Sequence, residues 1–122
     1  MATATRLISP EEFAETWAYL EPFLAEVDRA SDQPVTFYEA LTALAFVWFA
    51  ELPVDAQVIE VGMGGTWDAT NLVHGEVAII NRVGLDHREL GDTPAEVAAE
   101  KAGIIKHGAT VVSQAQDDDV LD

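Results

Sequence analysis

Three short segments of the chain carry side chains whose types and spacing could do chemistry. An apolar run, Val58 to Val61, includes the carboxylate of Glu60 and leads into a glycine-rich loop, residues 62–67 (Gly-Met-Gly-Gly-Thr-Trp), called the glycine loop below. Asp86-His87 follows a second apolar run, and Glu100-Lys101-Ala102-Gly103 lies further along. Because glycine lets the backbone approach a ligand closely, a strand that delivers a carboxylate to such a loop predicts a phosphate or metal site.

The same residues also have simpler interpretations. Glu60 could be a solvated carboxylate or a helix-cap acceptor. His87 could form a structural hydrogen-bonded pair with Asp86 and not bind a metal, since magnesium prefers oxygen ligands. Lys101 on an amphipathic helix could be an exposed lysine, and Trp67 could pack or stack on a ligand. The glycine loop is not a Walker A motif, because the Lys-Ser or Lys-Thr pair that contacts phosphate and magnesium does not follow it.

Composition restricts the classes of partner. The chain has 122 residues, no cysteine, and 22 acidic against 6 basic residues, giving a formal charge of -16. This charge argues against nucleic acid or an anionic membrane as a partner, because both require clustered Lys and Arg. The longest apolar run, Ala43 to Ala50, is much shorter than the ~20 residues that span a bilayer. These features predict a soluble, cytoplasmic chain.

Three capping patterns predict helices. Ser9-Pro10-Glu11-Glu12 predicts a helix from Pro10 to about Ala30, Thr36-Phe37-Tyr38-Glu39 opens another that runs to about Glu51, and Thr93-Pro94-Ala95-Glu96 opens one that runs to about Ile105. The first helix has an apolar stripe that we expect to be buried, formed by Phe13, Trp17, Leu20, Phe23, Leu24 and Val27.

Apolar runs at 57–62, 77–83 and 110–113 predict short strands of a parallel sheet covered on both faces. The order of helices and strands predicts an α/β fold with a doubly wound sheet, whose ligands bind at the carboxyl ends of the strands. We expect residues 114–122, which include three consecutive aspartates, to form a frayed acidic tail.

Three segments resemble, in their order and residue types, motifs of the central domain of the folylpolyglutamate synthase and dihydrofolate synthase branch of the Mur ligase superfamily. They are Glu60–Asn71, Asp86-His87 and Glu100–Lys106. The similarity runs from about Ser9 to about Val112. It implies that residues 1–113 form part of a P-loop NTPase-like central domain, a mostly parallel sheet flanked by helices. The family's Gly-Thr-Asn-Gly-Lys-Gly-Ser phosphate loop and its glutamate-binding domain have no counterpart in this sequence.

The resemblance implies ATP and magnesium as cofactors, folate and L-glutamate as substrates, and a role for each motif. Glu60 and His87 would be magnesium ligands. Lys101 matches a lysine that is carbamylated in the family, which turns it into a carboxylate-like group able to hold a second magnesium. Four residues would line the nucleotide and folate side of the site: Gly64, Gly65, Asp68 and Asn71.

Two departures from the family pattern bear on this interpretation. Thr66 stands where the family usually has arginine, which removes an anchor or a charge partner for Asp68, and the stretch from His87 to Gly91 is one residue shorter than usual. We therefore expect the chain alone to be inactive and to need the missing domains. Two alternatives remain open: a non-catalytic interaction module, and a Mur ligase acting on another carboxylate.

Overall fold

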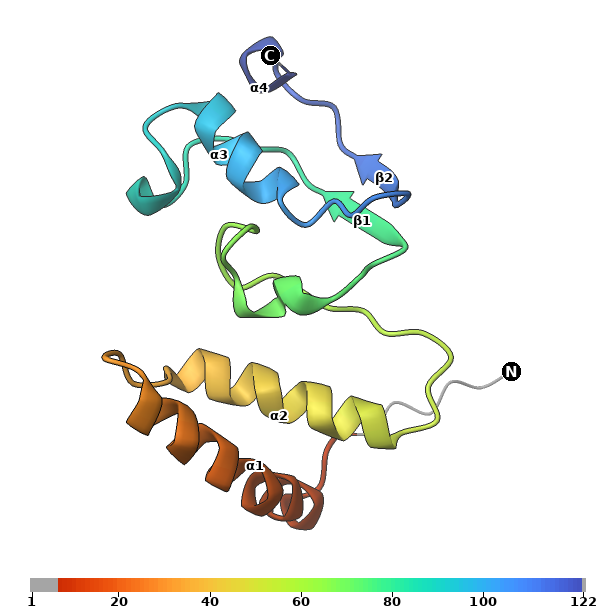
Figure 1. Ribbon diagram of the computed structural model, residues 1–122. Helices are drawn as coiled ribbons and strands as arrows, with labels where there is room; N and C mark the ends of the chain where they lie inside the picture. The colour runs from red at the N-terminus through yellow and green to blue at the C-terminus, as the bar shows by residue number, and fades with distance from the viewer. Residues whose placement is uncertain (1–6, 122) are drawn as a thin grey trace. The chain divides into compact units, whose positions relative to one another are not determined.

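A computed structural model describes residues 7–121 (Figure 1). The chain divides into two compact units, one extending to Gln57 and the other beginning at Val58. All the predicted site residues belong to the second unit. No helix in residues 7–121 is long and apolar enough to cross a membrane.

The first unit is a pair of helices, α1 (Pro10–Ala30) and α2 (Phe37–Glu51), and both match the sequence prediction. Each begins with a capping box: the Ser9 hydroxyl accepts from the Glu12 N–H, and the Thr36 hydroxyl accepts from the Glu39 N–H. The two reciprocal bonds satisfy N–H groups that have no partner within the helix. Because the residues that form them lie within four consecutive positions, the helix starts can be predicted from local sequence.

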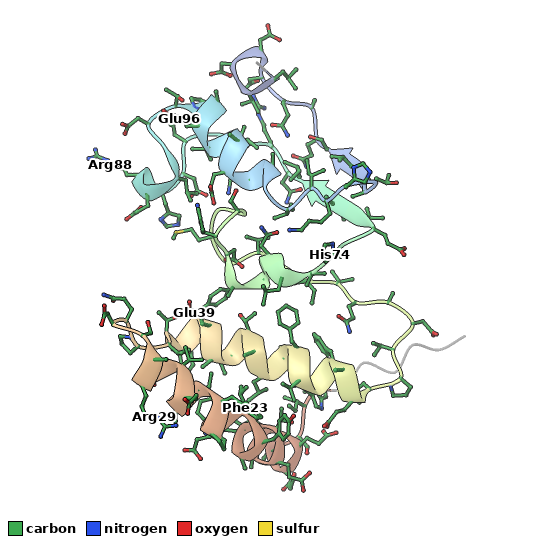
Figure 2. All side chains as sticks on the ribbon, viewed as in Figure 1. Phe23, Arg29, Glu39, His74, Arg88 and Glu96 are labelled. Carbon is green, nitrogen blue, oxygen red and sulfur yellow. The ribbon has the colours of Figure 1, made fainter. Side chains whose placement is uncertain are left out.

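The apolar stripe of α1 is buried only in part. Leu20 is buried, as are Ala40 and Leu44 of α2, whereas Phe23 is 56% exposed and Val27 is 50% exposed. Figure 2 labels Phe23 on α1. The prediction that the whole stripe is buried was therefore wrong for these two residues and for Phe13, which is 38% exposed, because a helix in a two-helix pair buries only the side that meets its partner.

The second unit is built on a parallel strand pair connected through a helix. Strand β1 (Val77–Ile80) pairs with β2 (Thr110–Ser113) in a register that places Val77 opposite Thr110. Helix α3 (Pro94–Ala102) lies on the connection between the strands, as Figure 1 shows. Short 3-10 helices η1 (Ala69–Leu72) and η2 (Arg88–Leu90) and a C-terminal helix α4 (Asp118–Leu121) complete the described elements.

The mixed α/β class and the parallel pairing are thus observed, but the sheet of residues 7–121 has two strands and not three. Residues 57–62 are not a strand, and Val58 is 94% exposed, so the predicted buried strand was wrong. A strand exists only where its backbone groups pair with a neighbour, and an apolar run alone does not supply that neighbour. Strand β1 ends at Ile80 instead of Val83, and α3 ends at Ala102 instead of Ile105.

The segment after β2 contacts the segment after β1. The Gln114 Oε1 accepts from the Arg82 N–H at 3.0 Å, and the Gln116 Oε1 accepts from the Val83 N–H at 2.8 Å. Arg82 also donates to both carboxylate oxygens of Asp117 at 2.7 Å, and this pairing raises the pKa of the Arg82 guanidinium. Three residues of the predicted acidic tail, Gln114, Gln116 and Asp117, thus contact the second unit, and the last residue of that tail, Asp122, lies outside the described residues.

Candidate functional site

The glycine loop packs directly against the last turn of α3. Gly64 and Gly65 are both buried. A Cβ on Gly65 would lie 2.6 Å from the Glu100 carbonyl oxygen and 2.8 Å from that of Lys101. Gly64 has a φ of +72°, a backbone conformation that favours glycine. The close backbone approach that the sequence suggested for a ligand is thus made to α3, and it brings the loop against the backbone of Lys101.

Asp68 shapes the glycine loop from inside the chain. Its Oδ2 accepts from the backbone N–H groups of Gly62 at 3.1 Å and Met63 at 2.9 Å. Its Oδ1 accepts from the Thr70 N–H at 2.9 Å and the Thr70 hydroxyl at 2.6 Å, which caps η1. Four donors therefore surround this carboxylate, so it is satisfied without the arginine that the family usually carries at position 66.

Thr66 joins the glycine loop to the end of α3. Its N–H and its hydroxyl both donate to the Glu100 carbonyl oxygen at 3.1 Å. This carbonyl belongs to the last turn of α3 and also accepts from the Gly103 N–H at 3.2 Å, so Thr66 adds two donors to a bond that the helix end already makes. A Cβ on Gly103 would lie 2.1 Å from the Thr66 Oγ1, so a side chain at position 103 would collide with Thr66.

Asn71 and Lys106 close the same junction from the other side. The Asn71 Nδ2 donates to the carbonyl oxygens of Thr66 at 2.9 Å and Gly103 at 3.2 Å. The Lys106 Nζ donates to the Asn71 Oδ1 at 2.8 Å and to its backbone carbonyl oxygen at 3.0 Å. The side-chain oxygen and nitrogen of Asn71 are therefore bonded within the chain. Sequence reasoning singled out Asn71 but missed Lys106, whose only signal was its place at the end of the Glu-Lys-Ala-Gly segment.

Asp86 meets Lys101 across the unit. The Lys101 Nζ lies 3.3 Å from the Asp86 Oδ2, and the His87 Nε2 lies 3.8 Å from the Asp86 Oδ1. The Lys101 side chain is 28% exposed, and those of Asp86 and His87 are about half exposed or more. Two of the three predicted motifs therefore come together at one carboxylate, and the glycine loop lies against the same helix that carries Lys101.

Glu60 lies in the irregular segment before the glycine loop and is exposed. Among the described residues, no three His, Cys, Asp or Glu side chains gather where they could hold a metal ion. Magnesium usually keeps several waters and takes one or two protein carboxylates together with substrate phosphates.

Comparison with known proteins identifies the family. No protein-family model matched the chain. It is 44% identical over 106 residues to a dihydrofolate synthase/folylpolyglutamate synthase of Mycobacterium tuberculosis, covering 80% of this chain and 22% of the relative. It is 40% identical over 108 residues to the protein of the same description from Bacillus subtilis, covering 87% of this chain and 25% of the relative. The chain belongs to the folylpolyglutamate synthase and dihydrofolate synthase family.

Solved structures of this family share the fold. A structure described as an FPGS–AMPPCP–folate complex matches 95% of this chain and 29% of its own chain, with a TM-score of 0.86 and 36% identity. The Mycobacterium tuberculosis folylpolyglutamate synthase complexed with ADP and AMPPCP matches 93% of this chain and 27% of its own, with a TM-score of 0.79 and 40% identity. The chain thus spans about a quarter of the length of the relatives it matches. The two solved structures are described as complexes with nucleotides and, in one case, with folate.

Proposed function

We propose that this chain belongs to an ATP-dependent ligase that adds L-glutamate to folates, and that it contributes Lys101 and the residues that bind magnesium. Membership in the family supports this reaction class. The observation that carries the proposal further is the meeting of Asp86, Lys101 and the glycine loop at the C-terminal end of α3, because it unites in space three motifs that are separate in the sequence.

In the proposed reaction the substrate carboxylate attacks the γ-phosphorus of ATP, giving an acyl phosphate and ADP. The amine of glutamate then attacks the acyl carbon, so that an amide forms, phosphate leaves and the amine loses a proton. Magnesium would neutralise the phosphoryl oxygens. The protein's contribution is to position the reacting groups, with Glu60 and His87 proposed as the magnesium ligands.

Lys101 is proposed to act as its carbamate. In the structure its ammonium pairs with Asp86 at 3.3 Å. Carbamylation, in which the deprotonated amine adds to CO2 and releases a proton, would replace that cation with an anion. Two carboxylate-like groups would then face each other, an arrangement that a divalent cation between them stabilises. Gly64, Gly65, Asp68 and Asn71 are proposed to form the nucleotide and folate side of the site. Asp68 and Asn71 would do so by holding the loop, since their polar atoms bond within the chain.

Calorimetric titration of the protein with AMPPCP, with and without magnesium chloride, tests these assignments. We expect His87→Ala and Glu60→Ala each to lower the magnesium-dependent affinity by at least about 10-fold. His74→Ala and Glu76→Ala, which change exposed residues of the same types in the same unit, are the matched controls. Equal affinities for site and control variants would reject the metal assignments.

The chain alone is expected not to turn over ATP. Phosphate release from the purified protein, measured with ATP, folate and glutamate, should stay at the level without glutamate. Glutamate-dependent release that disappears in Glu60→Ala would overturn this expectation. Replacing folate with peptidoglycan precursors in the binding titration tests the alternative substrate class.

A second candidate, a non-catalytic interaction module, is favoured by one observation. Parallel sheets are normally covered on both faces, yet the apolar residues of this strand pair are largely exposed, and Ile79 is 65% exposed. Sedimentation velocity and thermal unfolding separate the two candidate functions. Self-association supports the interaction module, whereas a monodisperse monomer that melts cooperatively argues against the module.

A further inference from the structure

Lys106 is held at the junction between the glycine loop and the end of α3, unlike a solvated surface lysine. The residue is half-buried, and its ammonium donates to two oxygens of Asn71 at 2.8 and 3.0 Å. Fixing a long side chain in one conformation costs rotamer entropy. Hydrogen bonds from a charged donor are strong enough to offset that cost when two acceptors converge on it.

The ammonium also determines how the Asn71 amide is oriented. A lysine ammonium offers only donors, so the atom that Asn71 presents to it is Oδ1. Its Nδ2 must then face the opposite side, where the carbonyl oxygens of Thr66 and Gly103 both accept from it. Lys106 therefore acts on the glycine loop and on the end of α3 through one intermediate side chain.

The junction that results can neither close further nor open freely. The two segments already lie so close that atoms of one occupy the space where a Cβ on Gly65 or Gly103 would be, which leaves little room for further approach. Separation is opposed by the bonds of Asn71 and by those of Thr66 to the Glu100 carbonyl. Since Glu100 precedes Lys101 on the same helix, this contact sets the spacing between the loop and Lys101.

We propose that Lys106 is a positioning residue, which holds Asn71 so that the glycine loop stays at a fixed distance from Lys101. The effect on ligand binding rests on the proposed function above, because the loop and Lys101 are assigned to the site there. The effect on the junction itself does not depend on that function.

Amide exchange measured by NMR on the full chain tests the junction. In Lys106→Met we expect the Thr66 amide to exchange roughly 10-fold faster, whereas the Val97 amide, which donates within the first turn of α3, keeps its wild-type rate. Lys106→Arg, which can donate to the same two oxygens, should restore slow exchange. Arg29→Met, which removes the same charge from α1, should leave Thr66 unchanged.

Unchanged exchange at Thr66 in Lys106→Met would overturn the proposal. If Thr66 and Val97 accelerate together, the variant has lost its fold, and Asn71→Asp then decides. That substitution keeps an acceptor for Lys106 but removes both amide donors, so Thr66 exchange should again rise roughly 10-fold. Wild-type exchange of the Thr66 amide in Asn71→Asp would reject the proposal that Asn71 holds the junction.

A second measurement separates positioning from a purely structural role. The affinity for magnesium and AMPPCP should fall by roughly 10-fold in Lys106→Met and stay within about 3-fold of wild type in Lys106→Arg. A loosened junction with unchanged affinity would overturn the positioning role. If the wild-type chain binds no nucleotide, the proposed function fails and the positioning role fails with it. The exchange results would still decide whether Lys106 and Asn71 hold the junction.

Discussion

At the scale of single residues, the glycines of this site are explained by the distance between two backbones. Gly65 lies so close to α3 that a Cβ would fall 2.6 Å from the Glu100 carbonyl and 3.0 Å from the Lys101 Cα. The opposing atoms are backbone, which cannot rotate away as a side chain can. The glycine loop would therefore have to leave the helix if position 65 carried a side chain.

Gly65→Ala is expected to destabilise the second unit by roughly 1–3 kcal/mol, because it overpacks a rigid contact. Gly84→Ala is the matched control, since a Cβ at Gly84 has no neighbouring atom within 4 Å. The control should be neutral or slightly stabilising, because alanine reduces the freedom of the unfolded chain. Urea denaturation of both variants measures the difference, and equal midpoints would contradict the packing explanation.

At the scale of elements, the start of α3 makes the stability of the second unit depend on pH. The Glu96 carboxylate, labelled in Figure 2, accepts from the N–H groups of Asp92 at 2.8 Å and Thr93 at 3.0 Å. The Asp92 N–H, the Thr93 side chain and the Thr93 N–H, in that order of size, lower the pKa of Glu96 below its usual 4.5. A lowered folded-state pKa stabilises the fold above the unfolded pKa, and this stabilisation is lost as pH falls through the folded value.

We therefore expect unfolding free energy to fall as pH drops below about 4.5, and to fall less in Glu96→Gln, whose amide cannot be protonated in this range. Thr93→Ala removes the hydroxyl of the capping box and should cost about 1 kcal/mol at neutral pH. Thermal unfolding followed by circular dichroism between pH 7 and pH 3 measures both effects. A wild-type and a Glu96→Gln profile with the same slope would count against the cap as the titrating contact.

The elements also show what local sequence could predict. The starts of α1, α2 and α3 were predicted because a capping box is written within four consecutive residues. The strand expected at 57–62 failed because pairing depends on a distant segment. The contacts of the segment after β2 were not predicted for a related reason: they come from the side chains of Gln114 and Gln116, which bond to backbone N–H groups more than 30 positions away.

Likewise, only part of the candidate site could be predicted from the sequence. The motif residues near Asp86 and Lys101 were predicted from their similarity to a family, and the structure places these two within 3.3 Å. The role of Lys106 depends on Asn71, which is 35 positions away in the chain, and no local pattern contains that contact. Metal ligation by Glu60 and His87 stays a prediction.

At the scale of the whole molecule, the chain consists of two units, each with its own buried residues. Leu44, 4% exposed, lies in the first unit, and Val97, fully buried, lies in the second. Residues 53–57, between α2 and the second unit, are exposed. Compact units can open separately, so we expect each unit to respond to the loss of its own buried side chain.

Leu44→Ala should destabilise the helix pair by roughly 2–5 kcal/mol, because it leaves a cavity among buried atoms. Amide exchange in α2 should then accelerate, while the amides of β1 keep their wild-type rates. Val97→Ala should show the reverse pattern, with a loss of roughly 2 kcal/mol confined to the second unit. If either substitution accelerates exchange in both units equally, the chain unfolds as one cooperative body, and the second unit could not be treated as an independent carrier of the candidate site.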